Sequence, residues 1–141
     1  MKRKYLLVIL VLILAIFLAG CNGIITPDTD EAKIKSVINE YFLAISNQNW
    51  SKAKSCCVYG SDRYYATCQG ESLINSLYEY CNIVTINTYA DILSVSTYGN
   101  YSDVYLYLTA LITACGYYES DSNYGYYYLQ KVGNSWKIYA P

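Results

Sequence analysis

The clearest pattern along the chain is a set of apolar residues at helical spacing between residues 34 and 45. They recur every three or four residues, which places them on one face of an α-helix, and the positions between them are mostly polar. Asp28, followed three residues later by Glu31, resembles a capping box at the start of this helix. The pattern predicts a first amphipathic helix that buries Ile34, Val37, Ile38, Tyr41, Phe42 and Ile45.

Two further helices are predicted before the pattern changes. The polar run 47–49 interrupts the first helix and can cap a shorter second helix that carries Trp50, Ala53 and Cys57. Gly60 and Asp62 indicate a loop. Residues 71–81 predict a third helix, because one face of it would hold Leu73, Ile74, Leu77, Tyr78 and Cys81.

After residue 82 the apolar period falls from about 3.6 to about 2, as in β-strands. Residues 83–98 predict a strand that is bent or bulged near Ala90 and Asp91, and Gly99-Asn100 forms the turn that follows it. We expect a polar turn at 119–123, a third strand at 124–132 and a last strand at 136–139 after a Gly133-Asn134 hairpin. The second strand would bury Val104, Leu106, Leu108, Ala110, Ile112 and Ala114 and turn Asp103, Tyr105, Tyr107, Thr109, Leu111 and Thr113 outward.

The amino terminus has the three zones of an export signal. Basic residues at 2–4 precede fifteen uncharged, mostly apolar residues at 5–19, and small residues lead to Cys21. A fifteen-residue helix covers only about 22 Å, which is short of the ~30 Å membrane core and argues against a permanent span. Leu18-Ala19-Gly20-Cys21 resembles the lipobox of bacterial lipoproteins, which implies diacylglycerol on the Cys21 sulfur and cleavage before it. The alternative is an ordinary signal that happens to end in cysteine.

These boundaries predict three parts: a signal peptide at 1–20, a lipidated tether at 21–29 and one folded domain at 30–141. The anchor would place the domain on the extracytoplasmic face of the cell membrane or outer membrane. Export permits disulfides among the remaining cysteines, at most two because their number is odd. No C-x-x-C pair is present, so zinc binding is disfavoured, and the pairing is left open among Cys56, Cys57, Cys68, Cys81 and Cys115.

The order of elements, three helices and then about four antiparallel strands, gives an α+β fold class. Residues 41–45 followed by Trp50-Ser51-Lys52-Ala53 resemble the opening of nuclear-transport-factor-2-like (NTF2-like) domains. The closing residues 129–138 resemble the final hairpin of those domains, in which a Gly-containing turn precedes Trp136-Lys137-Ile138. The resemblance implies a cystatin-like cone: a curved sheet around the helices, an internal pocket and frequent dimerisation through the outer sheet face. It implies no single function.

Composition narrows the chemistry. Residues 21–141 carry seven basic and eleven acidic side chains, so we expect no nucleic-acid partner. The chain contains no histidine, which removes the commonest general base and metal ligand, and we expect neither a metal nor another cofactor. Asp91, inside a predicted strand with apolar neighbours, is the one weak candidate for a buried catalytic base paired with a tyrosine. Asp62 and Arg63 are interpreted as a solvated ion pair in a loop.

Tyrosine is abundant, with 19 residues, and suits half-buried sheets and interaction surfaces because one end of its ring is polar. Tyr105, Tyr107, Tyr126 and Tyr128 are therefore a candidate binding surface. Three functions stay open: a non-enzymatic cone that binds a small apolar ligand or an envelope protein, an isomerase, dehydratase or hydrolase that uses Asp91, and a structural envelope protein that dimerises through its sheet.

Overall fold

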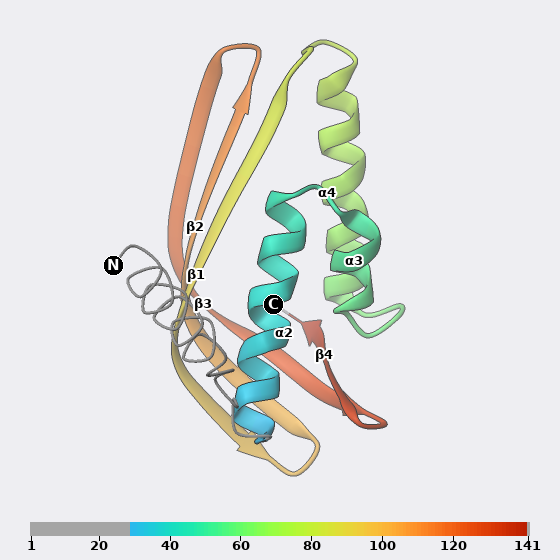
Figure 1. Ribbon diagram of the computed structural model, residues 1–141, viewed down its shortest axis with the longest axis vertical. Helices are drawn as coiled ribbons and strands as arrows, with labels where there is room; N and C mark the ends of the chain where they lie inside the picture. The colour runs from blue at the N-terminus through green and yellow to red at the C-terminus, as the bar shows by residue number, and fades with distance from the viewer. Residues whose placement is uncertain (1–28, 141) are drawn as a thin grey trace, which may run out of the picture.

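The computed structural model describes residues 29–140, so the predicted signal, Cys21 and Asp28 lie outside the described residues. Three helices come first: α2 (Asp30–Ser46), α3 (Trp50–Ser55) and α4 (Asp62–Tyr78). Four strands follow: β1 (Val84–Tyr98), β2 (Tyr101–Ala114), β3 (Tyr117–Val132) and β4 (Ser135–Ala140). The strands form one antiparallel sheet in the order β1-β2-β3-β4, and Figure 1 shows the helices together on one of its faces. The predicted α+β arrangement is confirmed.

Helix α2 lies on the sheet through the apolar face that the sequence predicts. Ile34 and Ile38 are fully buried, and Tyr41 and Phe42 are nearly so. The cap differs from the prediction: the Thr29 hydroxyl, one residue after Asp28, accepts a hydrogen bond from the Ala32 backbone N–H at 3.2 Å. A Thr side chain at this position satisfies one of the unpaired N–H groups of the first turn.

Helix α4 begins nine residues earlier than the predicted third helix. The Ser61 hydroxyl accepts from the Tyr64 N–H at 3.3 Å, so Asp62 belongs to the first turn of a helix and not to a loop. The first half of α4 was missed because its sequence has no apolar stripe, and its buried residue there is Thr67. At the other end the helix stops at Tyr78, before Cys81.

The long strands agree with the predicted alternation but correct two of its details. Val104 and Leu106 of β2 are fully buried against the helices. The register of β1 against β2 shifts between Ile92 and Ser94, so the bulge lies at Leu93 and not at Ala90 and Asp91. Residues 119–123 form part of β3, and the turn that precedes this strand is Cys115-Gly116, where both residues have positive φ, 52° and 82°. A two-residue turn with both φ angles positive matches the twist of a hairpin.

The buried side chains form two clusters on the concave side of the sheet. The larger one joins Phe42 of α2, Leu129 of β3 and Trp136 of β4, and the smaller one joins Ile74, Cys81, Val84 and Ile86. Residues 56–58 continue the sheet beyond β4, because the Val58 N–H donates to the Ile138 carbonyl at 2.8 Å and the Ile138 N–H donates to the Cys56 carbonyl at 2.9 Å. None of the helices within residues 29–140 is both long and apolar enough to cross a membrane.

Candidate functional site

A cavity of about 240 Å³, open to solvent, lies between the two core clusters and is lined by α2, α4 and the inner face of the sheet. Most of its walls are apolar, and no Asp or Glu of the described residues belongs to them. The long strands β1 and β2 run beside α4 (Figure 1) and supply the apolar wall opposite it. The lining residues are Tyr41, Phe42, Ile45, Trp50, Arg63, Ala66, Thr67, Gly70, Leu73, Ile74, Ile86, Thr88, Leu108, Ala110, Ile112 and Tyr127.

Arg63 supplies the charge in this cavity. Its guanidinium carbon lies 4.4 Å from the centre of the Tyr127 ring and 5.7 Å from that of Tyr41, both cation–π distances. Among the described residues no Asp or Glu forms an ion pair with it. Its Nε atom is buried and has no hydrogen-bond partner. The structure therefore holds a cation inside an apolar cavity without a protein anion to balance it.

A ring of hydrogen bonds holds Arg63 in this position. The Thr67 hydroxyl donates to the Arg63 backbone carbonyl at 2.8 Å, as a helical Thr does four residues after its acceptor. Because that proton is used, the Tyr41 hydroxyl donates to the Thr67 oxygen at 3.0 Å. The Tyr41 oxygen in turn accepts from Arg63 Nη1 at 3.5 Å, a long contact. The two hydroxyl protons are thus committed within the protein.

Burial sets the protonation of these groups. It opposes the charge on Arg63, yet the Tyr127 and Tyr41 oxygens leave the pKa of Arg63 above its ordinary value, so the guanidinium stays charged. Burial raises the pKa of Tyr127 despite the nearby Arg63, which keeps this phenol protonated at neutral pH. Burial also raises the pKa of Cys57, whose sulfur lies 3.8 Å from the Thr67 oxygen, to about 11.

Asp91 does not lie in the cavity. Its side chain is exposed on the sheet face opposite the core, and its partner across the sheet is Tyr107. It lines a groove at the β1 edge of the sheet together with Leu43 and Asn47 of α2 and its own neighbours. The expectation of a buried base at this position is therefore wrong. The side chains of a strand alternate between faces, and the core face of β1 takes Ala90 and Ile92.

Arg63 is the site residue that the sequence interpretation missed. It was assigned with Asp62 to a solvated loop, but it belongs to the first turn of α4, and its guanidinium contacts the Tyr127 ring. The available signal was weak: a Ser-Asp pair that can cap a helix, followed directly by the arginine. The partner of this residue, Tyr127, is 64 positions away and could not be inferred from local spacing.

The four tyrosines predicted as a binding surface lie together on the outer face of the sheet. Tyr105 of β2 lies 4.7 Å from Tyr126 of β3 between ring centroids, and Tyr126 lies 6.3 Å from Tyr128. Tyr107 is linked to them through Tyr124, at 4.7 Å, which stacks on Tyr105 at 6.0 Å. We call these five residues the tyrosine face. At the β1–β2 turn the Tyr98 hydroxyl donates to Asp103 Oδ1 at 2.5 Å, and this hydrogen bond raises the pKa of Tyr98 to about 12.

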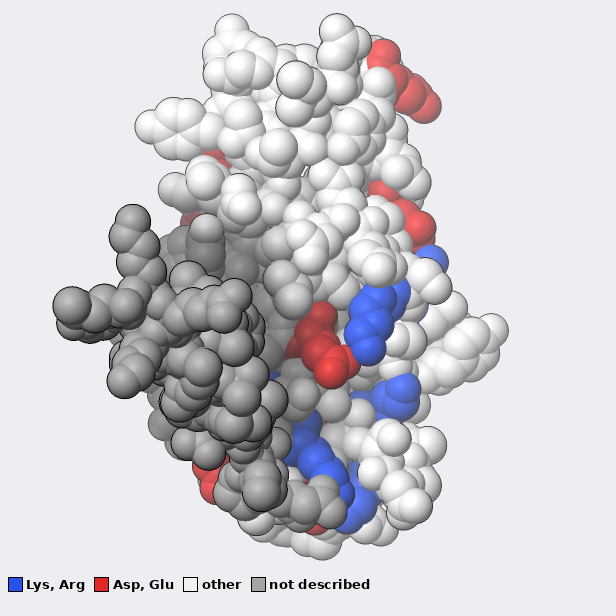
Figure 2. Space-filling view, in the orientation of Figure 1, with Lys and Arg blue, Asp and Glu red and all other residues white. Residues whose placement is uncertain are grey.

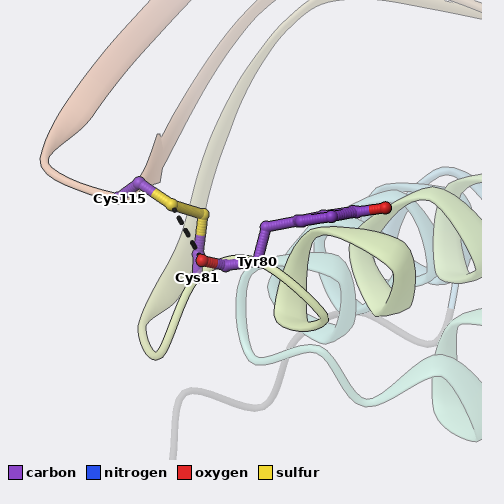
Figure 3. Close-up of a disulfide and its surroundings, with 3 residues drawn as sticks. All are labelled: Tyr80, Cys81 and Cys115. Carbon is purple, nitrogen blue, oxygen red and sulfur yellow. Dashed lines mark hydrogen bonds between the residues drawn. A yellow bond between two sulfur atoms is a disulfide. The ribbon is translucent and has the colours of Figure 1, made fainter.

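One disulfide joins two of the candidate cysteines, Cys81 after α4 and Cys115 in the turn between β2 and β3. Figure 3 shows this bond, with the Cys115 sulfur 3.5 Å from the Tyr80 carbonyl oxygen. Cys56, Cys57 and Cys68 are unpaired, the first two buried and the third partly exposed. Within residues 29–140 no group of three or more Cys, Asp or Glu side chains could hold a metal ion.

Two other hollows adjoin the domain surface. A groove of about 630 Å³ runs beside α3, but both of its lysines have partners: Lys54 pairs with Glu71 at 2.8 Å, and Lys137 donates to the Ser55 carbonyl. A depression of about 350 Å³ shares Ala110 and Ile112 with the cavity and adds Glu119 and Asp121 at its edge. Figure 2 shows that the upper part of the view, where Figure 1 places the β2–β3 turn and the end of α4, has few charged side chains, and those are acidic.

Comparison with known proteins identifies the fold. No family model matches the chain, and no curated protein matches its sequence. A conserved protein from Planctomyces limnophilus superposes with a TM-score of 0.61 at 13% identity, over 78% of this chain and 91% of that one. A candidate dehydratase of the NTF2-like family from Streptomyces avermitilis gives a TM-score of 0.61 at 13% identity, over 81% of this chain and 94% of that one.

A third similar structure, a protein of unknown function from Nostoc punctiforme, has a cystatin-like fold and a TM-score of 0.58 at 6% identity, over 78% and 86% of the two chains. Identities this low show a shared fold and leave the function open. The domain is thus an α+β cone of the NTF2-like, cystatin-like type, as the resemblance at the two ends of the domain implied.

Proposed function

We propose that the protein is a lipid-anchored, extracytoplasmic binding module whose cone takes up a small, mainly apolar ligand. The observation that carries this proposal is the cavity itself, which is apolar along Ile45, Ile86, Leu108 and Ile112. Ligand sites are typically concave and mainly apolar, with a few placed polar groups. At about 240 Å³ the cavity is smaller than the roughly 300–1,000 Å³ of ordinary ligand sites, so the ligand is small.

The membrane address in this proposal rests on the sequence. Cys21 ends a lipobox-like motif, and the folded domain begins only nine residues later, at Asp30. The anchor would keep the cone within a short distance of the membrane surface, because an extended chain covers at most about 3.6 Å per residue.

Binding of indole, a neutral apolar probe, tests the cavity. We expect calorimetry on the full chain in lipid nanodiscs, with empty discs as the blank, to give saturable binding of one indole. Ala110→Phe places a ring in the cavity and should abolish binding. The matched control Thr113→Phe lies on the same strand but faces away from the cavity, so it should bind as the unaltered protein does. Absence of saturable binding to the unaltered protein, or undiminished binding to Ala110→Phe, contradicts the proposal.

The alternative enzyme, an isomerase, dehydratase or hydrolase based on Asp91, finds less support. A catalytic base must come within hydrogen-bond reach of its substrate, and Asp91 lies outside the cavity that would hold one. The similar structure that is named as a candidate dehydratase shares 13% of its sequence with this chain, which shows a common fold and no common activity.

A second candidate role is homodimerisation through the tyrosine face, as in a structural envelope protein. The observation that favours it is the cluster itself, since Tyr124 and Tyr126 are 63% and 51% exposed on a sheet face without helices. Tyrosine is enriched at protein interfaces. We expect light scattering to find a dimer that Tyr105→Lys with Tyr126→Lys converts to a monomer, whereas Tyr59→Lys, on the α3–α4 loop, leaves it intact. A monomer at high concentration would exclude this role.

A further inference from the structure

We infer that the ligand of the cone is a small monocarboxylate, whose carboxylate group pairs with Arg63. This inference rests on the proposed function, because it names the class of molecule that the cavity takes. Its starting point is an imbalance of charge. A buried charge is costly unless it is paired and hydrogen-bonded, and Arg63 has an unpartnered, buried Nε and no ion pair within residues 29–140.

The geometry makes the arginine the charged hydrogen-bond donor that a ligand meets. The hydroxyl protons of Tyr41 and Thr67 are committed to the ring of bonds that ends on the Arg63 carbonyl. The guanidinium carbon lies 4.4 Å from the centre of the Tyr127 ring, Nε is buried, and Nη1 makes one long contact of 3.5 Å with the Tyr41 oxygen, so a partner in the cavity would meet the terminal Nη groups. A planar acceptor with two oxygens fits these groups in a bidentate manner.

The count of charges selects a carboxylate over a phosphate. Arg63 is the one basic residue of the cavity wall in the described part of the chain, so it balances one negative charge. A phosphate group carries up to two charges at neutral pH and three acceptor oxygens, and such sites usually gather several donors. The remaining walls are apolar side chains, which suit a hydrocarbon or aromatic body attached to the carboxylate.

The distribution of acidic groups favours one orientation of a carboxylate in the cavity. Glu119 and Asp121 stand at the edge of the depression that adjoins the cavity at Ala110 and Ile112. Asp121 is six residues from Tyr127 along β3, about 20 Å at the rise of a strand. The acidic edge and the Arg63 end are therefore well separated, and repulsion by the acids directs a carboxylate toward Arg63.

Phenylacetate and its neutral isostere phenylacetamide test this inference. Calorimetry on the full chain in nanodiscs would compare the unaltered protein with Arg63→Gln, Arg63→Lys and Lys35→Gln. We expect the unaltered protein to bind the acid about tenfold or more tightly than the amide. Arg63→Gln should bring that ratio close to one by weakening the acid alone, and Arg63→Lys should give an intermediate ratio because it keeps the charge and loses the planar fork.

Lys35→Gln is the matched control, because it removes the same unit of charge from an exposed position on α2 and should leave the ratio unchanged. The ratio is measured within each variant, so a loss of folded protein in Arg63→Gln affects both compounds alike. Equal affinity for acid and amide in the unaltered protein, or an unchanged ratio in Arg63→Gln, overturns the inference and leaves the apolar cavity as a binding site. Binding of neither compound, together with absent indole binding, overturns the proposed function as well.

Discussion

At the scale of single residues, burial decides which cysteines can react. The thiolate is the reactive form of cysteine. Burial raises the pKa of Cys57 to about 11, so at pH 8 only about one molecule in a thousand carries the thiolate there. Cys56 is also buried and its pKa is raised by the same cause, whereas Cys68 is partly exposed.

We therefore predict selective alkylation of the folded protein. A short pulse of iodoacetamide at pH 8, followed by peptide mass spectrometry, should label Cys68 and leave Cys56 and Cys57 largely unmodified. The same pulse in denaturant should label all three, which controls for peptide detection. Labelling of Cys57 at the rate of Cys68 in the folded protein would show that Cys57 is accessible and ionised, against the structure.

Asp30 is a second residue whose charge has a structural role. Its carboxylate accepts from Trp136 Nε1 at 3.0 Å and pairs with Lys131 at 3.0 Å, and these partners lower its pKa. It thus ties the first turn of α2 to the β3–β4 hairpin, and its negative charge is favourable at a helix N-terminus. It also satisfies the indole N–H of Trp136, whose ring is 2% exposed.

Asp30→Asn should lower the melting temperature at pH 7. In the folded protein the pKa of Asp30 lies below the value of about 3.9 that it has in the unfolded chain. The stabilisation by its charge is therefore complete above about pH 3.9 and is lost as the pH falls through the folded pKa. The difference in melting temperature between the two proteins should therefore shrink between pH 5 and pH 3, measured by circular dichroism. Glu31→Gln, in an exposed pair with Lys35, is the control and should have little effect. A difference independent of pH would assign the effect to something other than this charge.

At the scale of elements, the disulfide links the end of α4 to the far turn of the sheet. Cys81 also packs in the smaller core cluster with Ile74, Val84 and Ile86. The bond closes a loop with a sequence separation of 34, and cross-links of this length typically stabilise by about 2–4 kcal/mol. It holds the strands that form the wall of the cavity at Ile86 and Ile112 against α4.

Replacement of both cysteines, Cys81→Ala with Cys115→Ala, should lower the free energy of unfolding by about 2–4 kcal/mol. Urea denaturation followed by tryptophan fluorescence would measure it. Cys68→Ala, which removes an unpaired cysteine of α4, should change the stability much less. If the double variant and the unaltered protein unfold at the same denaturant concentration, the disulfide does not contribute to the stability of the folded state.

The same elements show how far sequence patterns reach. The periodicity of α2 and the alternation of β2 were predictable because each buries one continuous apolar face. The start of α4 was not, because its first turns bury a polar network around Thr67. The turn expected at residues 119–123 was wrong because both faces of this polar stretch of β3 are exposed to solvent, where a strand needs no apolar residues. The Arg63 site combines two such segments, so its chemistry appears only when the fold joins them.

At the scale of the whole molecule, the cavity lies away from the end of α2 that the predicted anchor would join. The predicted tether would join α2 at Asp30, whereas the cavity begins at Tyr41 and Phe42, about 17 Å along the helix axis at its rise of 1.5 Å per residue. The lipid at Cys21 would therefore hold the cone near the membrane without placing the cavity in the lipid. On this arrangement the ligand reaches Arg63 from the aqueous phase.

The anchor itself is the last prediction. In bacteria that export the chain, labelled palmitate should appear on the protein, and the protein should sediment with membranes. Each buried CH₂ contributes about 0.8 kcal/mol, so two or three acyl chains give stable attachment. Cys21→Ser should abolish the label, because a hydroxyl cannot form the thioether. Cys68→Ser, which leaves Cys21 in place, should keep both label and location. Label that persists in Cys21→Ser would place the lipid on another residue, and the tether would then not join the membrane to α2 as argued above.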